Sequence, residues 1–370
     1  MTRQLNIVSV NQDRGISPRR QKGAAVHLRA MRRAFTQTGA QVSSIDEPDG
    51  VRVMFQLHGM NREKPIDLIY ERYALGKSAA AEFARAHHIP YALEVNAPLA
   101  QEQSRWRTAG DETQDTAADR VTFGQADYIL AVSTAVADYA ARRGGRVDAI
   151  EVVPNGIDSS RFNFAARRDA GIFKPDPGST FVLGFHGRER PWHGFDRLAE
   201  LVRSLLDRDM PVHLKIIGKG DFDALKRLPE DAFTRLPWVE HDDLPSHLAT
   251  MDAMPFCYSP DLPCYFSPLK LMEGMACGVV PLVPALGDLP GAVREGHDGL
   301  VYMPGDFEAL QEMVISLIGD REQCHRMAIN AAKTASRHDW TSIAEGVLEN
   351  VFGRQVRTGT GEAASQVNPL

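Results

Sequence analysis

Short apolar runs alternate with helical patterns along most of the chain. In the first half the apolar runs lie at 5–10, 51–57, 66–70, 91–95 and 128–132. Between several of them, apolar positions recur with the period of an amphipathic helix, near 77–88, 113–125 and 134–143. Strands that alternate with helices favour an α/β fold with a parallel sheet.

The first strand predicted from this pattern is followed by a long, basic loop that contains glycine. A helix is expected from Gly23, with Leu28, Met31 and Phe35 on one face and Gly39 as its stop. A strand, a loop and a helix in this order are typical of a doubly wound domain, which binds ligands outside the carboxyl ends of its strands. The loop has no GxGxxG motif, so a dinucleotide fingerprint is not supported.

The same alternation restarts in the second half, after a turn signal at Pro154, Asn155 and Gly156. A polar linker is expected to reach about 179, followed by a strand from 181, a helix over 195–208 and a strand from 212. The last of these ends at Gly218 and Lys219. A length of 370 residues also suits two domains better than one.

The stretch from 258 to 283 is predicted to form a loop, a helix and a buried strand. Ser267 suits an N-cap, Pro268 the first helical position and Gly278 the helix stop. The amino end of this helix, at 267–270, suits a phosphate, and Lys270 adds a full positive charge. Glu273 lies six residues beyond Ser267, roughly 9 Å along the axis, which is about the span from a diphosphate to a ribose. The alternative is an ordinary capped helix with one exposed glutamate.

Composition narrows the class of protein. The chain is 43% hydrophobic and 24% charged, which is ordinary for a soluble globular protein. Its four cysteines show no paired metal spacing and fit a reducing compartment. We expect a cytoplasmic protein, since the first residues lack the apolar run of a signal peptide and no window is apolar enough for a membrane helix. The net charge of −6 does not suggest nucleic acid as a partner.

Basic residues concentrate in the region 14–33. They are Arg14, Arg19, Arg20, Lys22, Arg29, Arg32 and Arg33. Such a run is usually a solvated face. The alternative is a basic lip that contacts an anionic acceptor or the inner face of a membrane.

Four stretches, taken in order, resemble glycosyltransferase family 4. They are EVVPNGID from Glu151, HGRERPWHGFDRL from His186, FSPLKLMEGMACG from Phe266 and DLPGAVREGHDGLVYMPGD from Asp288. The resemblance covers the chain from Leu5 to about Phe352. It implies the GT-B fold, in which two doubly wound, Rossmann-like domains face a central cleft. Residues 1–160 would form the acceptor-side domain, 161–337 the nucleotide-sugar domain, 338–352 a helix returning to the first domain, and 353–370 a disordered tail.

The resemblance also implies a reaction and a set of site residues. Family members transfer a sugar from a nucleoside diphosphate to a hydroxyl acceptor, with retention and without a metal or a cofactor. Arg188, Lys270 and the amides at Ser267, Pro268 and Leu269 would hold the diphosphate. Glu273 would hold the ribose. Gly23, His193, Gly218 and Lys219 would also face the donor, although Gly23 could equally be a plain helix start and Lys219 a solvated turn.

Three positions depart from the family pattern. Asn96 stands where the family often has a histidine near the reacting sugar, and a carboxamide cannot act as a general base; it could also be a turn residue at a strand end. Tyr265 stands where many relatives have a first glutamate, and His193 where they have a lysine. We expect that Lys270 supplies the charge missing at 193. The departures leave two alternatives to a transferase open, namely a sugar-nucleotide epimerase and a catalytically silent binding subunit.

Overall fold

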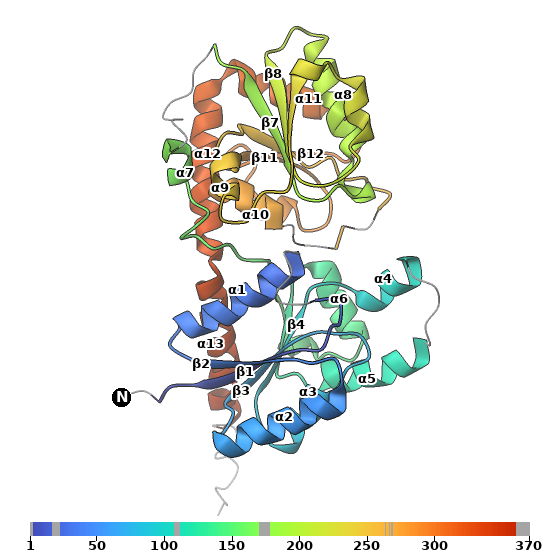
Figure 1. Cartoon of the computed structure of the whole chain (residues 1–370), viewed down its shortest axis with the longest axis vertical. Helices are drawn as coiled ribbons and strands as arrows, with labels where there is room; N and C mark the ends of the chain where they lie inside the picture. The colour runs from blue at the N-terminus through green and yellow to red at the C-terminus, as the bar shows by residue number, and fades with distance from the viewer. Residues whose placement is uncertain are drawn as a thin grey trace, which may run out of the picture. The chain divides into compact units, whose positions relative to one another are not determined.

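The chain folds into two compact units. The computed structural model describes residues 3–16, 23–106, 112–169, 178–262, 264–265, 267 and 269–359. Unit 1 comprises Met1–Asn155 and Trp340–Leu370, and unit 2 comprises Gly156–Asp339 (Figure 1). Each unit contains one sheet of six parallel strands with helices packed against it, as the alternating pattern predicts. The chain therefore passes between the units twice.

The sheet of unit 1 has the strand order β2-β1-β3-β4-β5-β6. Its strands are β1 (Asn6–Asn11), β2 (Gln41–Asp46), β3 (Leu68–Arg72), β4 (Tyr91–Val95), β5 (Tyr128–Ala131) and β6 (Ile150–Val152). Its helices are α1 (Gly23–Gln37), α2 (Gly50–Glu63), α3 (Ala79–Ala86), α4 (Leu99–Trp106), α5 (Glu112–Gly124), α6 (Thr134–Arg142) and α13 (Trp340–Gly359). The strand order reverses direction between β1 and β3, and this switch point is where doubly wound sheets bind ligands.

Helix α1 packs through the predicted stripe. Leu28, Met31 and Phe35 are fully buried, and the ring of Phe35 lies 4.9 Å from that of Tyr70 on β3. Burying three large apolar side chains contributes roughly 1.5–3 kcal/mol for each. The helix ends before Gly39, whose φ of +91° favours glycine. This element is therefore confirmed in position and in the face that it buries.

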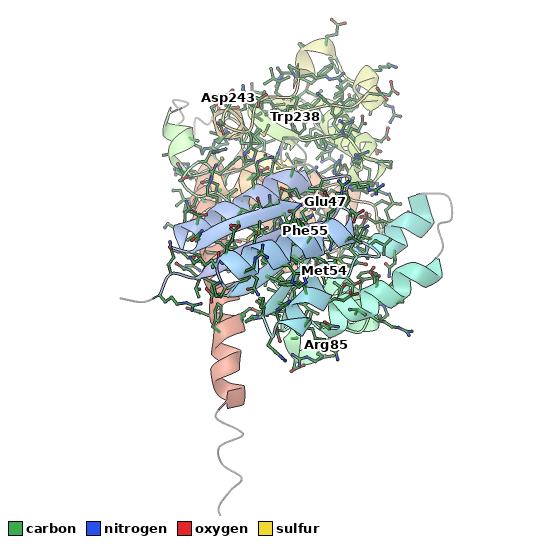
Figure 2. All side chains as sticks on the ribbon, turned by 60° about the horizontal axis from the view of Figure 1, so that its bottom comes forward. Glu47, Met54, Phe55, Arg85, Trp238 and Asp243 are labelled. Atoms are coloured by element: carbon green, nitrogen blue, oxygen red, sulfur yellow. The ribbon has the colours of Figure 1, made fainter. Side chains whose placement is uncertain are left out.

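The apolar run at 51–57 is a helix, and its expected role as a strand is wrong. Asp49 caps α2, since its carboxylate accepts from the amides of Val51 and Arg52. Val53 and Leu57, four residues apart, are fully buried, whereas Val51 and Phe55 are 81% and 80% exposed (Figure 2). The buried positions repeat every four residues, as on one face of a helix, but the apolar residues between them obscured this period in the sequence. The adjacent strand β2 was not predicted, because its edge position buries little beyond Ile45.

The sheet of unit 2 has the strand order β12-β11-β10-β7-β8-β9. Its strands are β7 (Phe181–His186), β8 (Val212–Ile217), β9 (Phe233–Leu236), β10 (Ala253–Pro255), β11 (Val280–Pro284) and β12 (Leu300–Tyr302). Its helices are α7 (Ala165–Asp169), α8 (Phe195–Leu206), α9 (Leu244–Leu248), α10 (Leu269–Ala276), α11 (Phe307–Gly319) and α12 (Arg321–Ala335). Here the switch point lies between β7 and β10.

The predicted helix stop at Gly278 is confirmed. Its φ is +77°, and strand β11 follows two residues later. The last helix, α13, begins at Trp340 and continues to Gly359, beyond the expected end at 352. Gly353 does not interrupt it, because glycine weakens a helix by only about 1 kcal/mol. Residues 360–370 of the expected tail lie outside the described residues.

Candidate functional site

The donor-site candidates of unit 2 lie where its central strands end. The loop 187–194 follows β7, the loop 218–222 follows β8, and the segment before α10 follows β10. Because parallel strands end at the same edge of a sheet, these loops share the carboxyl edge at the switch point. Arg188, His193, Gly218, Lys219, Lys270 and Glu273 all belong to this edge or to the helix that follows it.

Glycines allow the first two loops to touch through their backbones. The Gly187 amide donates to the Ile217 carbonyl over 2.8 Å, and the Glu189 amide donates to the Lys219 carbonyl over 2.8 Å. At Gly218 φ is +147°, and a Cβ would lie 1.9 Å from the Gly187 carbonyl oxygen. Gly218 is thus required by close backbone packing as well as by its conformation.

A third glycine joins the β7 loop to the segment after β10. Gly194 has a φ of +61°, and a Cβ there would lie 1.7 Å from the Cys257 carbonyl oxygen. The residue starts helix α8 and directly follows His193. This contact fixes His193 next to the segment that leads into α10.

Two basic side chains at this edge are available to a ligand. Arg188 and Lys219 are both exposed. Within the described part of the chain, neither side chain has a hydrogen bond or an ion pair. Two unneutralised cations that project from adjacent loops favour binding of an anion.

Lys270 lies in the first turn of α10 and is largely removed from solvent. Its Nζ atom is 3.0 Å from Nε2 of His193 and 4.8 Å from the ring centroid of Phe185. Burial lowers the pKa of Lys270 to about 7, and the nearby negative charge of Glu273 opposes that shift. Near neutral pH the amine is therefore only partly protonated, and an anion that binds beside it would favour its charged form.

His193 is neutral in this arrangement. A lysine ammonium can only donate, so the Nε2 atom of His193 must accept. Burial, followed by the charges of Lys270 and Arg190, lowers the pKa of His193 to about 2. The positive charge of the pair accordingly resides on Lys270.

Glu273 is buried, so the alternative of an exposed surface glutamate is wrong. Its Oε1 atom accepts from Nε2 of His241 at 2.9 Å, and its Oε2 atom lies 3.8 Å from Nε2 of His186. Burial alone would raise the pKa of Glu273. The hydrogen bond from His241, together with the electrostatic effects of the neighbouring His186 and Lys270 side chains, outweighs that effect, so the pKa is lowered and Glu273 is an anion.

Sequence reasoning missed both histidines that surround Glu273. His186 is the last residue of β7, and that position at the carboxyl edge was a usable signal. Burial lowers the pKa of His186, and its Nε2 atom lies 3.3 Å from the Lys270 carbonyl. His241 gave no local signal, because its contact with Glu273 spans 32 residues.

The amino end of α10 is described only in part. Helix α10 begins at Leu269, directly after the expected N-terminal position. Ser267 is described, whereas Pro268 lies outside the described residues. Half-buried Tyr265, at the position of the missing glutamate, belongs to the same segment.

In unit 1, Asn96 directly follows β4 beside a buried polar cluster. Its Nδ2 atom is 3.4 Å from Nδ1 of His27, and its buried Oδ1 atom has no hydrogen-bond partner among the described residues. Glu94 is in contact with Nε2 of His27 at 3.1 Å and with Nη1 of Arg72 at 2.7 Å. Burial opposes ionisation, but His27 and Arg72 lower the pKa of Glu94 to about 2. Gly23 is the first residue of α1.

A second buried carboxyl group in unit 1 was not predicted. Glu71 accepts from Nε2 of Gln12 at 2.7 Å and from the hydroxyl of Tyr91 at 2.6 Å. Burial raises the pKa of Glu71 to about 7 despite these two donors. The residue lies on β3, one of the two strands that flank the switch point.

Part of the basic region at 14–33 is already paired. Both terminal nitrogens of Arg32 donate to Asp46 at 2.9 Å, and its Nε atom donates to Ser9. Arg19, Arg20 and Lys22 lie outside the described residues. Arg32 is therefore not an open cation for an acceptor or a membrane. Within the described residues, no helix combines the length and apolarity that crossing a membrane requires.

The glycine contact between the β7 and β8 loops gives a test of the site's architecture. Gly218→Ala should lower the free energy of unfolding by on the order of 3 kcal/mol, because its Cβ overlaps a carbonyl and its φ is strained. Gly305→Ala is a matched control in the same unit, with a φ of +88° and nothing within 4 Å of its Cβ. Urea unfolding of both variants measures the difference. Equal losses would show that the contact with Gly187 is unimportant.

Comparison with known proteins places this site in a family. Residues 3–156 match the glycosyl transferase 4-like domain, and residues 180–320 match glycosyl transferases group 1. The D-inositol 3-phosphate glycosyltransferase of Nocardia farcinica is 28% identical over 226 residues, which are 56% of this chain and 48% of that protein. The match therefore spans about half of that relative. The glycogen synthase of Mycobacterium tuberculosis is 26% identical over 79% of this chain and 70% of its own length.

Solved structures agree on the fold. The Anabaena protein HepE in complex with UDP and glucose superposes with a TM-score of 0.67 at 20% identity, over 95% of this chain and all of that one. Sucrose-phosphate synthase from Thermosynechococcus elongatus gives a TM-score of 0.70 at 15% identity, over 96% of this chain and all of that one. The two family models together cover most of the chain. The chain belongs to the group 1 glycosyltransferases of family 4, and its two parallel α/β units form the GT-B fold.

Proposed function

We propose that this protein transfers a sugar from a nucleoside diphosphate to a hydroxyl acceptor, with retained anomeric configuration. The observation that carries the proposal is the charge arrangement on α10. Lys270 and Glu273 are held one turn apart at the carboxyl edge of unit 2, with Lys270 beside His193 and Glu273 beside His241. An anion site next to a carboxylate that can accept from two hydroxyls suits a diphosphate joined to a ribose.

Each part of the donor has a proposed partner. Lys270, Arg188 and Lys219 bind the diphosphate together with the backbone amides of Ser267 and Leu269. Glu273 accepts hydrogen bonds from the ribose. Trp238, 38% exposed in the loop after β9, is the partner that we propose for the base. Support for a uridine nucleotide comes from HepE, whose crystal structures contain UDP and UDP-glucose.

The reaction that we propose needs no protein nucleophile. The bond from the anomeric carbon to the β-phosphate oxygen breaks, and the acceptor oxygen bonds to the same face of that carbon. The acceptor proton passes to an oxygen of the departing diphosphate. Lys270 and Arg188 stabilise the charge that develops on this leaving group, which is electrostatic catalysis. The amide oxygen of Asn96, which is buried and has no hydrogen-bond partner among the described residues, accepts from a sugar hydroxyl and takes no proton.

We further propose that the reaction is independent of metal ions. The supply of cations supports this, since Arg188, Lys219 and Lys270 can neutralise the diphosphate themselves. We also propose a cytoplasmic setting, because the four cysteines are free thiols.

A sugar-nucleotide panel tests the proposed function. The protein is mixed with UDP-glucose, ADP-glucose and GDP-mannose, with and without a pool of acceptor alcohols, and release of nucleoside diphosphate is measured. We expect release that requires acceptor, persists in EDTA and yields a product with the anomeric configuration of the donor. Affinity without release would indicate a binding subunit, and a changed sugar would indicate an epimerase. Loss of turnover in EDTA with recovery in magnesium or manganese would contradict metal independence.

The buried amine of Lys270 predicts how donor affinity depends on pH. Its pKa of about 7 in the free protein means that it is charged below pH 7 and loses its proton above it. Since the bound diphosphate favours the charged form, the Kd for UDP-glucose should stay constant below pH 7 and then rise by up to about tenfold per pH unit. Titration calorimetry from pH 6 to 8.5 measures this. Lys270→Arg should remove the dependence, because arginine stays charged. An unchanged pH profile in that variant would exclude Lys270 as its source.

Paired variants test whether His193 or Lys270 makes the main contact to the diphosphate. His193→Ala should reduce turnover about tenfold, or by ~1.4 kcal/mol, because it removes only a neutral hydrogen-bonding group. Lys270→Ala should cost much more, because it removes the charge. Both are measured with saturating acceptor at pH 7. A larger loss of turnover in His193→Ala than in Lys270→Ala would show that position 193, and not Lys270 on α10, supplies the main contact to the diphosphate.

A further inference from the structure

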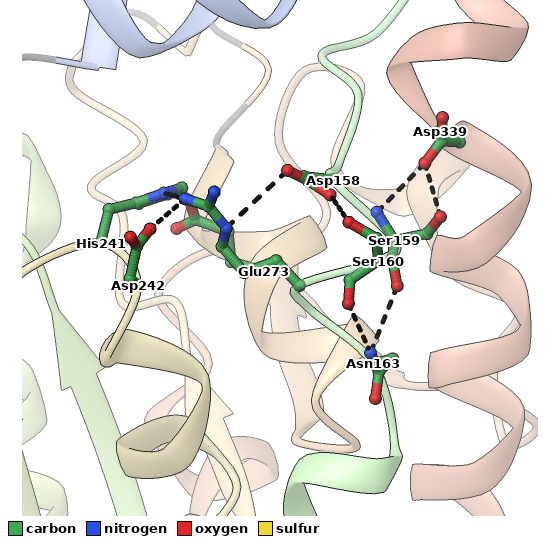
Figure 3. Close-up of polar contacts among 9 residues, drawn as sticks. Asp158, Ser159, Ser160, Asn163, His241, Asp242, Glu273 and Asp339 are labelled. Carbon is green, nitrogen blue, oxygen red and sulfur yellow. Dashed lines mark hydrogen bonds and ion pairs between the residues drawn. The ribbon is translucent and has the colours of Figure 1, made fainter. Parts of the chain in front are cut away.

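The two segments that connect unit 2 to unit 1 are bonded to each other. The chain enters unit 2 at Gly156 and leaves it at Asp339. The Ile157 amide donates to the His338 carbonyl over 2.8 Å. The amide and the hydroxyl of Ser159 donate to one carboxylate oxygen of Asp339, at 3.1 and 2.5 Å (Figure 3). Residues 156–159 and 338–339 therefore form one hydrogen-bonded connection.

Arg161 joins this connection to the loop that carries His241. Its Nε atom is 3.8 Å from Oδ2 of Asp158, and its Nη1 atom forms an ion pair with Asp242. The same Nη1 atom lies 3.4 Å from Nδ1 of His241. Figure 3 labels Asp158, His241 and Asp242, and its dashed lines mark these contacts. Arg161 is thus shared between the connecting segment and the donor-side loop.

These contacts define the tautomer of His241. A guanidinium can only donate, so Nδ1 of His241 accepts and Nε2 carries the hydrogen. Nε2 then donates to Oε1 of Glu273 at 2.9 Å. The neighbouring Phe162 fixes the imidazole from its side, with ring centroids 4.9 Å apart. The amide of Phe162 in turn donates to the Asp158 carbonyl over 2.8 Å.

We propose that Arg161 and His241 are positioning residues that orient Glu273 for the donor and couple its occupancy to the connecting segments. The inference rests on the proposed role of Glu273 toward the ribose. Ribose hydroxyls that bind Glu273 either share Oε1 with His241 or draw the carboxylate toward themselves through Oε2. Either change alters the His241–Arg161 contact, and Arg161 is anchored to Asp158 within the segment that holds Asp339. Donor binding then changes the contacts of residues 156–159 through Arg161.

Variants of the two positioning residues separate this role from a structural one. His241→Leu removes the donor to Glu273, whereas His241→Gln keeps an N–H at a similar reach. Arg161→Met removes the link to the connecting segment. The control is Arg208→Met, which breaks an exposed ion pair with Glu312 in the same unit. UDP, ADP and GDP serve as probes, and the one that the parent binds best is used throughout.

We expect His241→Leu and Arg161→Met to raise the Kd of the probe about tenfold, while His241→Gln and Arg208→Met stay within threefold of the parent. In these two variants the Michaelis constant for the donor should rise, whereas the Michaelis constant for the acceptor should stay unchanged. Hydrogen exchange provides the second readout. The probe should slow exchange at the amides of Ile157 and Ser159 in the parent and in Arg208→Met, and should not do so in Arg161→Met.

Two results would overturn the proposal. If Arg161→Met binds the probe as the parent does and keeps the protection at 157 and 159, the coupling does not exist while the proposed function stands. If the parent binds none of the three nucleoside diphosphates, the donor site itself is wrong and the coupling fails with it.

Discussion

The donor site depends on keeping two opposite charges on helix α10, where Glu273 is buried and Lys270 is partly buried. Lys270 and Glu273 lie three residues apart on α10, so both face the same side of the helix. Burial disfavours the charged form of each, and each favours the charged form of the other. Glu273 stays ionised because His241 also donates to it. Lys270 donates to the neutral His193, which brings no opposite charge, so the charge of Lys270 remains responsive to an anionic ligand.

The surrounding backbone makes this arrangement possible. Gly187, Gly194 and Gly218 have no side chains, and they therefore let three loops approach one another closely beside Lys270. Position 193 then determines what can face the amine. With Nζ of Lys270 only 3.0 Å away, a second lysine at 193 would bring two ammonium groups together, whereas a neutral histidine accepts a hydrogen bond. His193 and Lys270 are therefore best understood as one group that carries one charge.

Local signals predicted the elements whose contacts are local. The α1 stripe at Leu28, Met31 and Phe35 and the stop at Gly278 follow from spacing and glycine conformation, and the structure bears them out. The run at 51–57 was misleading, because five apolar residues in seven fit a strand as well as a helix. The contact of Glu273 with His241 was beyond reach for a different reason. It depends on the tertiary packing of the loop after β9 against α10, and a local sequence pattern does not predict such packing.

A crystal structure of the protein with UDP-glucose tests the central claim most directly. Our account predicts the β-phosphate within hydrogen-bonding distance of Nζ of Lys270 and of the Arg188 guanidinium, with the ribose hydroxyls on Glu273. It also predicts that Lys270 moves its hydrogen bond from His193 to the phosphate. A diphosphate bound elsewhere, with Lys270 still on His193 and Arg188 still without a partner, would contradict the account.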